Sequence, residues 1–112
     1  MTFERGDVVL IPFPFTDLSS LKQRPVLVLS HRAYNGSSPD FIVCGITSVL
    51  SGRPHAIPLL PTDMARGSLP LESRIRADKI FTLHQSLVKR RLGRVKPGVL
   101  AEVKKELLSL LN

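Results

Sequence analysis

Short apolar runs separated by turn-forming clusters are the feature of this sequence that most restricts its fold. Each run is long enough for one β-strand, and Gly, Pro, Asn and Ser residues end it at 35–39, 51–54 and 61–67. Several short strands with such breaks are typical of a small barrel. We therefore predict a mainly β fold, a small β-barrel, with strands near 7–13, 25–30, 40–46, 55–60, 73–81 and 89–95.

The end of the chain follows a different period. From Pro97 onward, apolar residues are spaced by threes and fours, which is typical of one face of an amphipathic helix. Pro97 suits the first turn, where a missing N–H is harmless. We predict a helix over 97–111 that covers one face of the barrel or forms a dimer contact. Its apolar stripe consists of Val99, Leu100, Val103, Leu107, Leu110 and Leu111.

Length and composition indicate one ordinary globular domain over residues 1–112, with 43% apolar and 22% charged residues. Cys44 is the single cysteine, so no intrachain disulfide can form, and its apolar surroundings predict a buried residue. The three histidines have no spacing that suggests a metal site, and we expect no metal or cofactor.

Charged residues interrupt the N-terminus before any signal-peptide core, and no apolar run approaches the roughly 20 residues of a membrane span, so we expect a cytoplasmic protein.

The positive charge is concentrated in the last third of the chain. The formal net charge is +7, yet residues 1–73 carry six Lys or Arg and six Asp or Glu. Residues 74–112 carry ten basic and three acidic residues and so hold the whole excess. This asymmetry indicates a polyanion as partner; a solvated basic face is the alternative.

Arg24 opens the alternating run Pro25 to Ser30, directly after the polar segment 16–23. Pro25 is tolerated at the first position of a strand, because its missing N–H costs no ladder hydrogen bond there. We therefore expect Arg24 at the mouth of a strand, facing a loop. A guanidinium held there can bind phosphate through two hydrogen bonds.

Five segments together resemble a known family. They are G-D-V-V-L-I-P-F-P-F-T-D at 6–17, K-Q-R-P-V-L-V-L-S at 22–30, I-T-S at 46–48, R-I-R-A-D-K at 74–79 and L-G-R-V at 92–95. In this order they resemble the MazF/PemK family, toxin endoribonucleases of bacterial and archaeal toxin–antitoxin pairs. The resemblance implies an SH3-like barrel with appended helices and a homodimer with RNA in a groove near its interface. It also implies a cognate antitoxin whose acidic segment blocks that groove.

Metal-independent cleavage of single-stranded RNA requires a proton to leave the 2′-OH, stabilisation of the phosphorane, and a proton for the leaving 5′-oxygen. The resemblance implies an acid/base role for Arg24. Because a guanidinium resists deprotonation, we instead expect Arg24 to stabilise the phosphorane electrostatically, and proton donation to the leaving group stays open. Thr47 and Ser48, at a strand end, can hold a phosphate oxygen. Asp78 can accept the 2′-OH proton, or orient a base or an arginine. Some family members carry a histidine in the loop before the Arg-Pro pair, where this chain has Asp17, so the general base and the cleavage motif stay open.

Further residues are expected to bind RNA. In a regular strand, Arg74, Arg76 and Asp78 lie on one face. By the same alternation, the basic residues of 89–94 lie on two opposite faces, Lys89 with Arg91 on one and Arg90 with Arg94 on the other. The alternative to an enzyme is a non-catalytic SH3-like module that binds nucleic acid or protein, because a small barrel does not decide function. The expected RNA-binding residues are Asp17, Arg74, Arg76, Lys79, Lys89 and Arg91.

Overall fold

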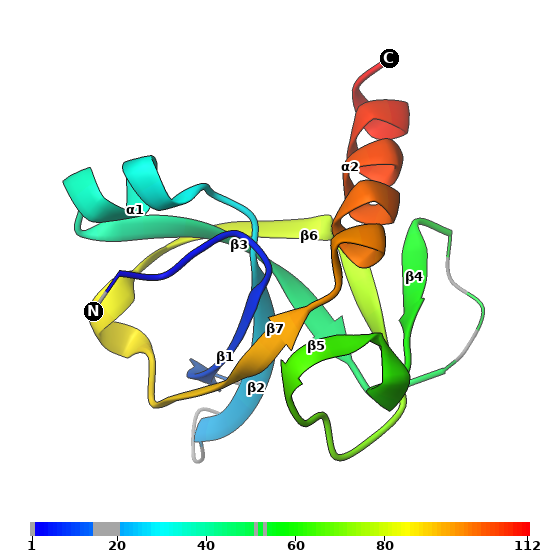
Figure 1. The fold of residues 1–112 in the computed structure, drawn as a ribbon, viewed down its shortest axis with the longest axis horizontal. Coiled ribbons are helices and arrows are strands. Elements are labelled where there is room, and N and C mark those ends of the chain that lie inside the picture. Colours follow the sequence, from blue (N-terminus) through cyan, green and yellow to red (C-terminus); the bar gives the residue numbers. More distant parts are fainter. Residues whose placement is uncertain (1, 15–20, 51, 53) are drawn as a thin grey trace.

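One curved antiparallel sheet dominates the computed structural model, which describes residues 2–14, 21–50, 52 and 54–112 (Figure 1). Within these residues the sheet has seven strands in the order β4-β6-β3-β2-β1-β7-β5. The strands are β1 Asp7–Pro14, β2 Leu21–Val28, β3 Asp40–Thr47, β4 Ala56–Leu59, β5 Met64–Gly67, β6 Ser73–His84 and β7 Arg90–Val95. The helices are α1 Arg32–Ser37 and α2 Pro97–Leu111, with 3-10 turns η1 Pro61–Asp63 and η2 Gln85–Leu87.

The central strands are buried on both faces, because the sheet curls into a half-barrel. Consecutive residues of β1 show this: Val8 belongs to an apolar cluster that α2 covers, and Val9 belongs to a second cluster on the other face. Phe3 and the far end of β6 cover the second cluster. The two edge strands, β4 and β5, lie at opposite ends of the strand order. The prediction of a mainly β fold with a C-terminal helix is confirmed.

α2 begins at Pro97, as the sequence predicted, and stands against β6 and β4 (Figure 1). Val99 and Val103 are buried in the first cluster, and Leu100 and Leu107 pack against it. The last turn differs from the predicted stripe, since its leucines are exposed, Leu111 most of all. Along the part of the chain that the structure describes, no helix has the length and apolarity needed to cross a bilayer.

β2 corrects the expected position of Arg24. The strand begins at Leu21, four residues before the predicted start, because β1 continues to pair with it where the apolar alternation has ended: Pro12 lies opposite Gln23. Arg24 is therefore inside a strand, opposite Ile11, and not at a strand mouth. Pairing between β2 and β3 begins at Val26, directly after Pro25.

Two other elements were not predicted. The short helix α1 follows β2, and the side chain of His31 caps it by accepting a hydrogen bond from the Tyr34 N–H at 3.1 Å. β5 lies in the predicted turn 61–67, where it pairs with β7. This pairing requires glycine: Gly67 has a φ of 71°, and a Cβ added to it would lie 2.0 Å from the Leu92 carbonyl oxygen.

Cys44 is buried in the first cluster, as predicted. Burial raises the pKa of its thiol to about 12, because the apolar surroundings disfavour the thiolate. Cys44 therefore acts as a small core residue and is not a nucleophile at neutral pH.

Candidate functional site

Arg24 lies between two cavities of the half-barrel. Its half-buried side chain lines a first cavity of about 260 Å³ and a second of about 310 Å³. Pro25 and Ile46 also line both, so the two cavities adjoin at these three residues.

The first cavity gathers predicted site residues from three adjacent strands. Arg24 comes from β2, Thr47 from the end of β3, and Arg76 and Lys79 from β6. The sheet register explains their meeting, since Gly45 of β3 lies opposite Val26 on one side and Arg76 on the other. Lys79 lies close to Gly45, since a Cβ added to Gly45 would be in van der Waals contact with the Lys79 Cβ, at 3.7 Å. The remaining walls are mainly apolar: Pro25, Val26, Ile46, Val49 and Phe81.

The second cavity combines apolar walls with a few polar side chains. Ser48 follows Thr47 in the chain but lines this cavity, together with Gln23 of β2 and Arg90 of β7. Its apolar walls include Leu10, Leu69, Leu71 and Leu92. Sequence reasoning placed neither Gln23 nor Arg90 in the site, because their approach to Ser48 depends on the strand order β3-β2-β1-β7.

A three-residue bulge in β6 shapes the edge of the first cavity. Cys44 pairs with Ile80, but the next residue of β3, Gly45, pairs with Arg76. Residues 77–79 are thus extra residues without partners in β3. Bulges re-aim side chains and occur often beside active sites. This bulge carries Asp78 and Lys79 out of the regular strand, next to Arg76.

Arg76 and Asp78 form a two-pronged ion pair. Arg76 Nε donates to Asp78 Oδ1 at 3.0 Å, and Arg76 Nη2 donates to Asp78 Oδ2 at 2.9 Å. These hydrogen bonds are the largest cause of a lowered pKa of Asp78, and they raise the pKa of Arg76. Both side chains are therefore charged at neutral pH. Arg76 and Asp78 point toward one another, as predicted, although the segment between them is a bulge and not the regular strand that the prediction assumed.

Arg74 and Lys89 are placed on strands next to this site. Arg74 lies on β6 opposite Thr47 of β3, and its side chain is half-buried. Lys89 precedes β7 and is exposed, and its backbone N–H donates to the Leu10 carbonyl at 2.8 Å. Asp17 lies outside the described residues.

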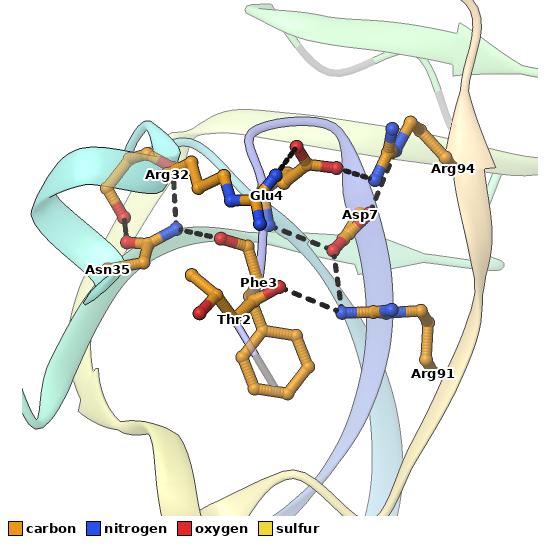
Figure 2. A network of polar contacts seen from close by, with 9 residues as sticks. Thr2, Phe3, Glu4, Asp7, Arg32, Asn35, Arg91 and Arg94 are labelled. Carbon is orange, nitrogen blue, oxygen red and sulfur yellow. Dashed lines mark hydrogen bonds and ion pairs between the residues drawn. The ribbon is translucent and has the colours of Figure 1, made fainter.

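Two arginines of β7 converge on one buried carboxylate (Figure 2). Arg94 Nε donates to Asp7 Oδ1 at 3.0 Å, and Arg91 Nη2 lies 3.2 Å from Asp7 Oδ2. The Asp7 side chain is 1% exposed. The guanidinium carbon of Arg91 lies 5.0 Å from the centre of the Phe3 ring, a cation–π arrangement. Both guanidiniums therefore hold the N-terminal segment against the sheet.

This arrangement corrects the predicted grouping of the β7 cations. Val8 pairs with Gly93 and Val9 with Arg91, so Leu92 is an extra residue in a bulge. Because one residue is inserted, Arg91 and Arg94 share a face although they are three apart. Arg90, predicted to accompany Arg94, lines the second cavity instead.

Neighbouring groups extend the Asp7 network. Glu4 accepts from Arg94 and from Arg32, and the Glu4 N–H donates to Asp7 Oδ2 at 3.0 Å. The Asn35 side-chain amide donates to the Phe3 carbonyl at 2.9 Å (Figure 2). The hydrogen bond to Asp7 is the largest cause of the raised pKa of Arg94. No group of three His, Cys, Asp or Glu residues suited to a metal ion occurs among the described residues.

Comparison with known proteins identifies the family. A family model described as a PemK-like, MazF-like toxin of type II toxin–antitoxin systems matches residues 4–111. The chain belongs to this family. All five sequence segments that suggested the MazF/PemK endoribonuclease toxins lie within the matched range, and the resemblance is confirmed. The sequence matches none of the curated proteins with which it was compared.

Solved structures of MazF-type proteins have the same fold. A MazE–MazF crystal structure from Deinococcus radiodurans is 30% identical, with a TM-score of 0.81, and the match covers 99% of this chain and 97% of that one. An endoribonuclease from Mycobacterial species, in complex with its cognate antitoxin, is 24% identical with a TM-score of 0.80, over 97% of this chain and 94% of that one. The Mycobacterium tuberculosis toxin MazF-mt6 is 17% identical with a TM-score of 0.70, and the match covers 92% of this chain and 95% of that one. The MazF-like chain is therefore matched over almost its whole length.

Proposed function

We propose that this MazF-like toxin is a metal-independent, sequence-selective endoribonuclease that cleaves single-stranded RNA by attack of a 2′-OH on the adjacent phosphate. The observation that carries the proposal is the meeting of Arg24, Thr47 and Arg76 around one cavity in a chain of this family. The RNA itself supplies the nucleophile, so the protein has to place charge and move protons.

Arg24 stabilises the phosphorane. It lies where the two cavities adjoin, so a phosphate bound there has one nucleoside in each cavity. A guanidinium stays protonated in proteins and presents its donors in a rigid fork. Arg24 therefore supplies charge and hydrogen bonds to the non-bridging oxygens, and it can donate a hydrogen bond to the leaving 5′-oxygen.

Thr47 and Ser48 hold the phosphate from the end of β3. The Thr47 hydroxyl accepts a hydrogen bond from the Val49 N–H at 3.1 Å, which leaves its own O–H available to donate. Thr47 lines the first cavity and Ser48 the second, so the two hydroxyls flank the proposed phosphate position.

Asp78 orients Arg76. Both of its carboxylate oxygens accept from Arg76, and its lowered pKa makes it a weak proton acceptor. Of the two roles that the sequence left open, we therefore favour the orienting one. Arg76 then faces the first cavity as a second cation for the RNA backbone.

The remaining basic side chains bind RNA outside the reacting phosphate. Lys79 lines the first cavity, and Arg74 lies near it, opposite Thr47. Lys89 is exposed just before β7, and Arg91 is held by Asp7. Asp17 precedes the Arg-Pro pair, in the segment where the family varies in RNA preference. The contacts of these three residues with RNA stay predictions. Single strands suit this site, because their unstacked bases can enter cavities, whereas bases in an A-form duplex cannot.

We also propose a homodimer and a cognate antitoxin as partners. The antitoxin follows from family membership and from the solved MazE–MazF and antitoxin complexes of relatives. The net charge of +7 complements an acidic antitoxin segment.

Incubation of purified protein with a structured RNA in excess EDTA, followed by mapping of the cut sites, tests the proposal. We expect cuts at a short recurring sequence in unpaired regions. Intact RNA under these conditions would instead favour the non-catalytic binding module. An Arg24→Ala preparation controls for contaminating nucleases.

A further inference from the structure

His55 has an unusual backbone conformation directly before β4. Its φ is 65°, in the left-handed region, and among the described residues it is the non-glycine residue found there. Such a conformation is disfavoured for residues with a Cβ, although histidine adopts it more often than most. It persists where the surroundings hold it, and such positions cluster at functional sites. The contacts that hold His55 in this conformation therefore bear on function.

Two contacts hold His55 in place, one through its backbone and one through its ring. The His55 carbonyl accepts the N–H of Ala77 at 3.2 Å. The ring Nδ1 lies 2.7 Å from Glu106 Oε1 on α2. A carboxylate can only accept a hydrogen bond, so the ring carries a proton on Nδ1. His55 thus links the C-terminal helix to β6.

The point of attachment on β6 is the bulge beside the first cavity. Ala77 is the first of the three extra residues, and Arg76 and Asp78 flank it. Residues 77–79 have no partner in β3, so pairing with β3 does not fix their geometry. The hydrogen bond to His55 supplies that restraint at Ala77. The neighbouring pairing lies on the same edge of β6: Arg76 pairs with Ala56, the residue after His55, so the His55–Ala77 hydrogen bond extends the β4–β6 ladder by one residue.

α2, which carries Glu106, is fixed by its packing against the core. Val99 and Val103 are buried in the first apolar cluster, and the helix packs against β6 and β4. Glu106 therefore projects from an element that the core fixes. His55 also lies close to the pair: the pKa of Asp78 is lowered chiefly by Arg76, and the nearby His55 is among the smaller causes.

We infer that His55 is a positioning residue for RNA cleavage: oriented by Glu106 of α2, it fixes the Ala77 bulge and so aims the Arg76–Asp78 pair at the first cavity. This inference rests on the proposed function. His55 does not touch the reacting atoms; it acts through the backbone of β6. Binding of RNA should therefore depend on it less than turnover does.

Steady-state cleavage of a short oligoribonucleotide tests the inference. His55→Gly removes the ring but adopts the left-handed φ without strain, and Glu106→Ala removes the partner. We expect each to lower kcat on the order of tenfold with KM changed by less than about twofold. The kcat of the double variant should be no lower than that of either single one, because both substitutions remove the same contact.

Glu106→Gln should regain most of kcat, since its amide oxygen still accepts a hydrogen bond from the ring. Glu102→Ala, an exposed acid on the same helix, should match the parent.

Hydrogen exchange at Ala77 tests directly whether His55 and Glu106 hold the bulge of β6 in place. We expect the Ala77 amide proton, followed by NMR, to exchange with solvent at least about tenfold faster in Glu106→Ala than in the parent or in Glu102→Ala. If His55→Gly does not fold, the Glu106 variants decide the matter. Parent-like kcat and parent-like Ala77 exchange in folded Glu106→Ala would overturn this role and leave the proposed function standing. A parent protein that leaves RNA intact would overturn the proposed function itself, and the positioning role with it.

Discussion

Arg76 and Asp78, two residues apart on β6, are joined by two parallel hydrogen bonds at the edge of the cavity that Arg24 also lines. A bidentate pair fixes the plane of the guanidinium as well as its position. The bulge at 77–79 makes room for it. The site therefore consists of one strand-held arginine, Arg24, facing a second arginine that a carboxylate orients.

Replacement of Arg24 should impair chemistry more than binding. We expect Arg24→Ala to lower the cleavage rate by on the order of a hundredfold or more, as for loss of a donor that stabilises developing charge. RNA affinity, measured by fluorescence anisotropy with a single-deoxy oligonucleotide, should fall much less. Arg66→Ala, which removes an exposed arginine from β5, serves as the matched control. Full activity in folded Arg24→Ala would end the role proposed for this residue.

Asp78 should behave as an orienting group and not as the general base. We expect Asp78→Asn to lower the rate by on the order of tenfold, because an amide offers Arg76 one acceptor oxygen in place of two. The acidic limb of the pH–rate profile should remain, since the pKa of Asp78 lies below its ordinary value and the group is ionised throughout the working range. Loss of that limb together with nearly all activity would assign proton abstraction to Asp78.

The same pair should contribute to stability in a pH-dependent way. The pKa of Asp78 is lower in the folded chain than its ordinary value of 3.8, so its contribution is present above that pH and is lost as the pH falls through the folded pKa. The pair is partly exposed, which limits the effect to under about 1 kcal/mol. Urea denaturation of parent and Asp78→Asn should show a difference in unfolding free energy at pH 7 that closes on acidification, as the pH falls through the lowered pKa of Asp78. A difference that widens on acidification would contradict this account.

Arg90 and Arg94 of β7 should differ in what their replacement changes, since Arg90 lines the second cavity and Arg94 pairs with the buried Asp7. Arg90→Ala should reduce the log–log salt slope of RNA binding by about 0.7, the value for one phosphate contact on a single strand. Arg94→Ala should instead lower the free energy of unfolding by about 3 kcal/mol, because it weakens the pairing of the buried Asp7 carboxylate. Arg91→Ala should act in the same direction. Equal slopes in Arg90→Ala and the parent would show that Arg90 makes no phosphate contact.

Assembly is checked by light scattering. We expect a two-fold dimer at micromolar concentration, with about twice the chain mass of 12.4 kDa, because closed two-fold symmetry is the commonest for small homo-oligomers. A stable, active monomer would refute the proposed homodimer while leaving the active-site residues in place.

Strands with clear apolar alternation and the terminal helix could be predicted from the sequence. β3 and β7 lie within a residue of their predicted bounds, and α2 begins at Pro97. β5 could not be predicted, because its four residues have no apolar alternation and form a strand only by pairing with β7. The early start of β2 likewise depends on its partner, β1.

The chemistry of the site could be predicted better than its geometry. Arg24, Thr47 and Arg76 were singled out by residue type and motif, yet their meeting at one cavity depends on the cross-strand register at Gly45. The roles of the β7 cations could not be predicted from the sequence for the same reason. A one-residue bulge at Leu92 moves Arg91 onto the face of Arg94, and a regular period of two cannot anticipate an inserted residue.

The central claim is that the RNA supplies its own nucleophile, and substrate chemistry tests it most directly. An oligoribonucleotide carrying one 2′-deoxy residue at the mapped cut site should resist cleavage in EDTA, while the all-ribose oligonucleotide is cut to a product ending in a 2′,3′-cyclic phosphate. Mass spectrometry of the two reactions distinguishes these outcomes. Cleavage of the deoxy substrate, or activity that returns only when Mg²⁺ is restored, would contradict the account and indicate a metal-activated water instead.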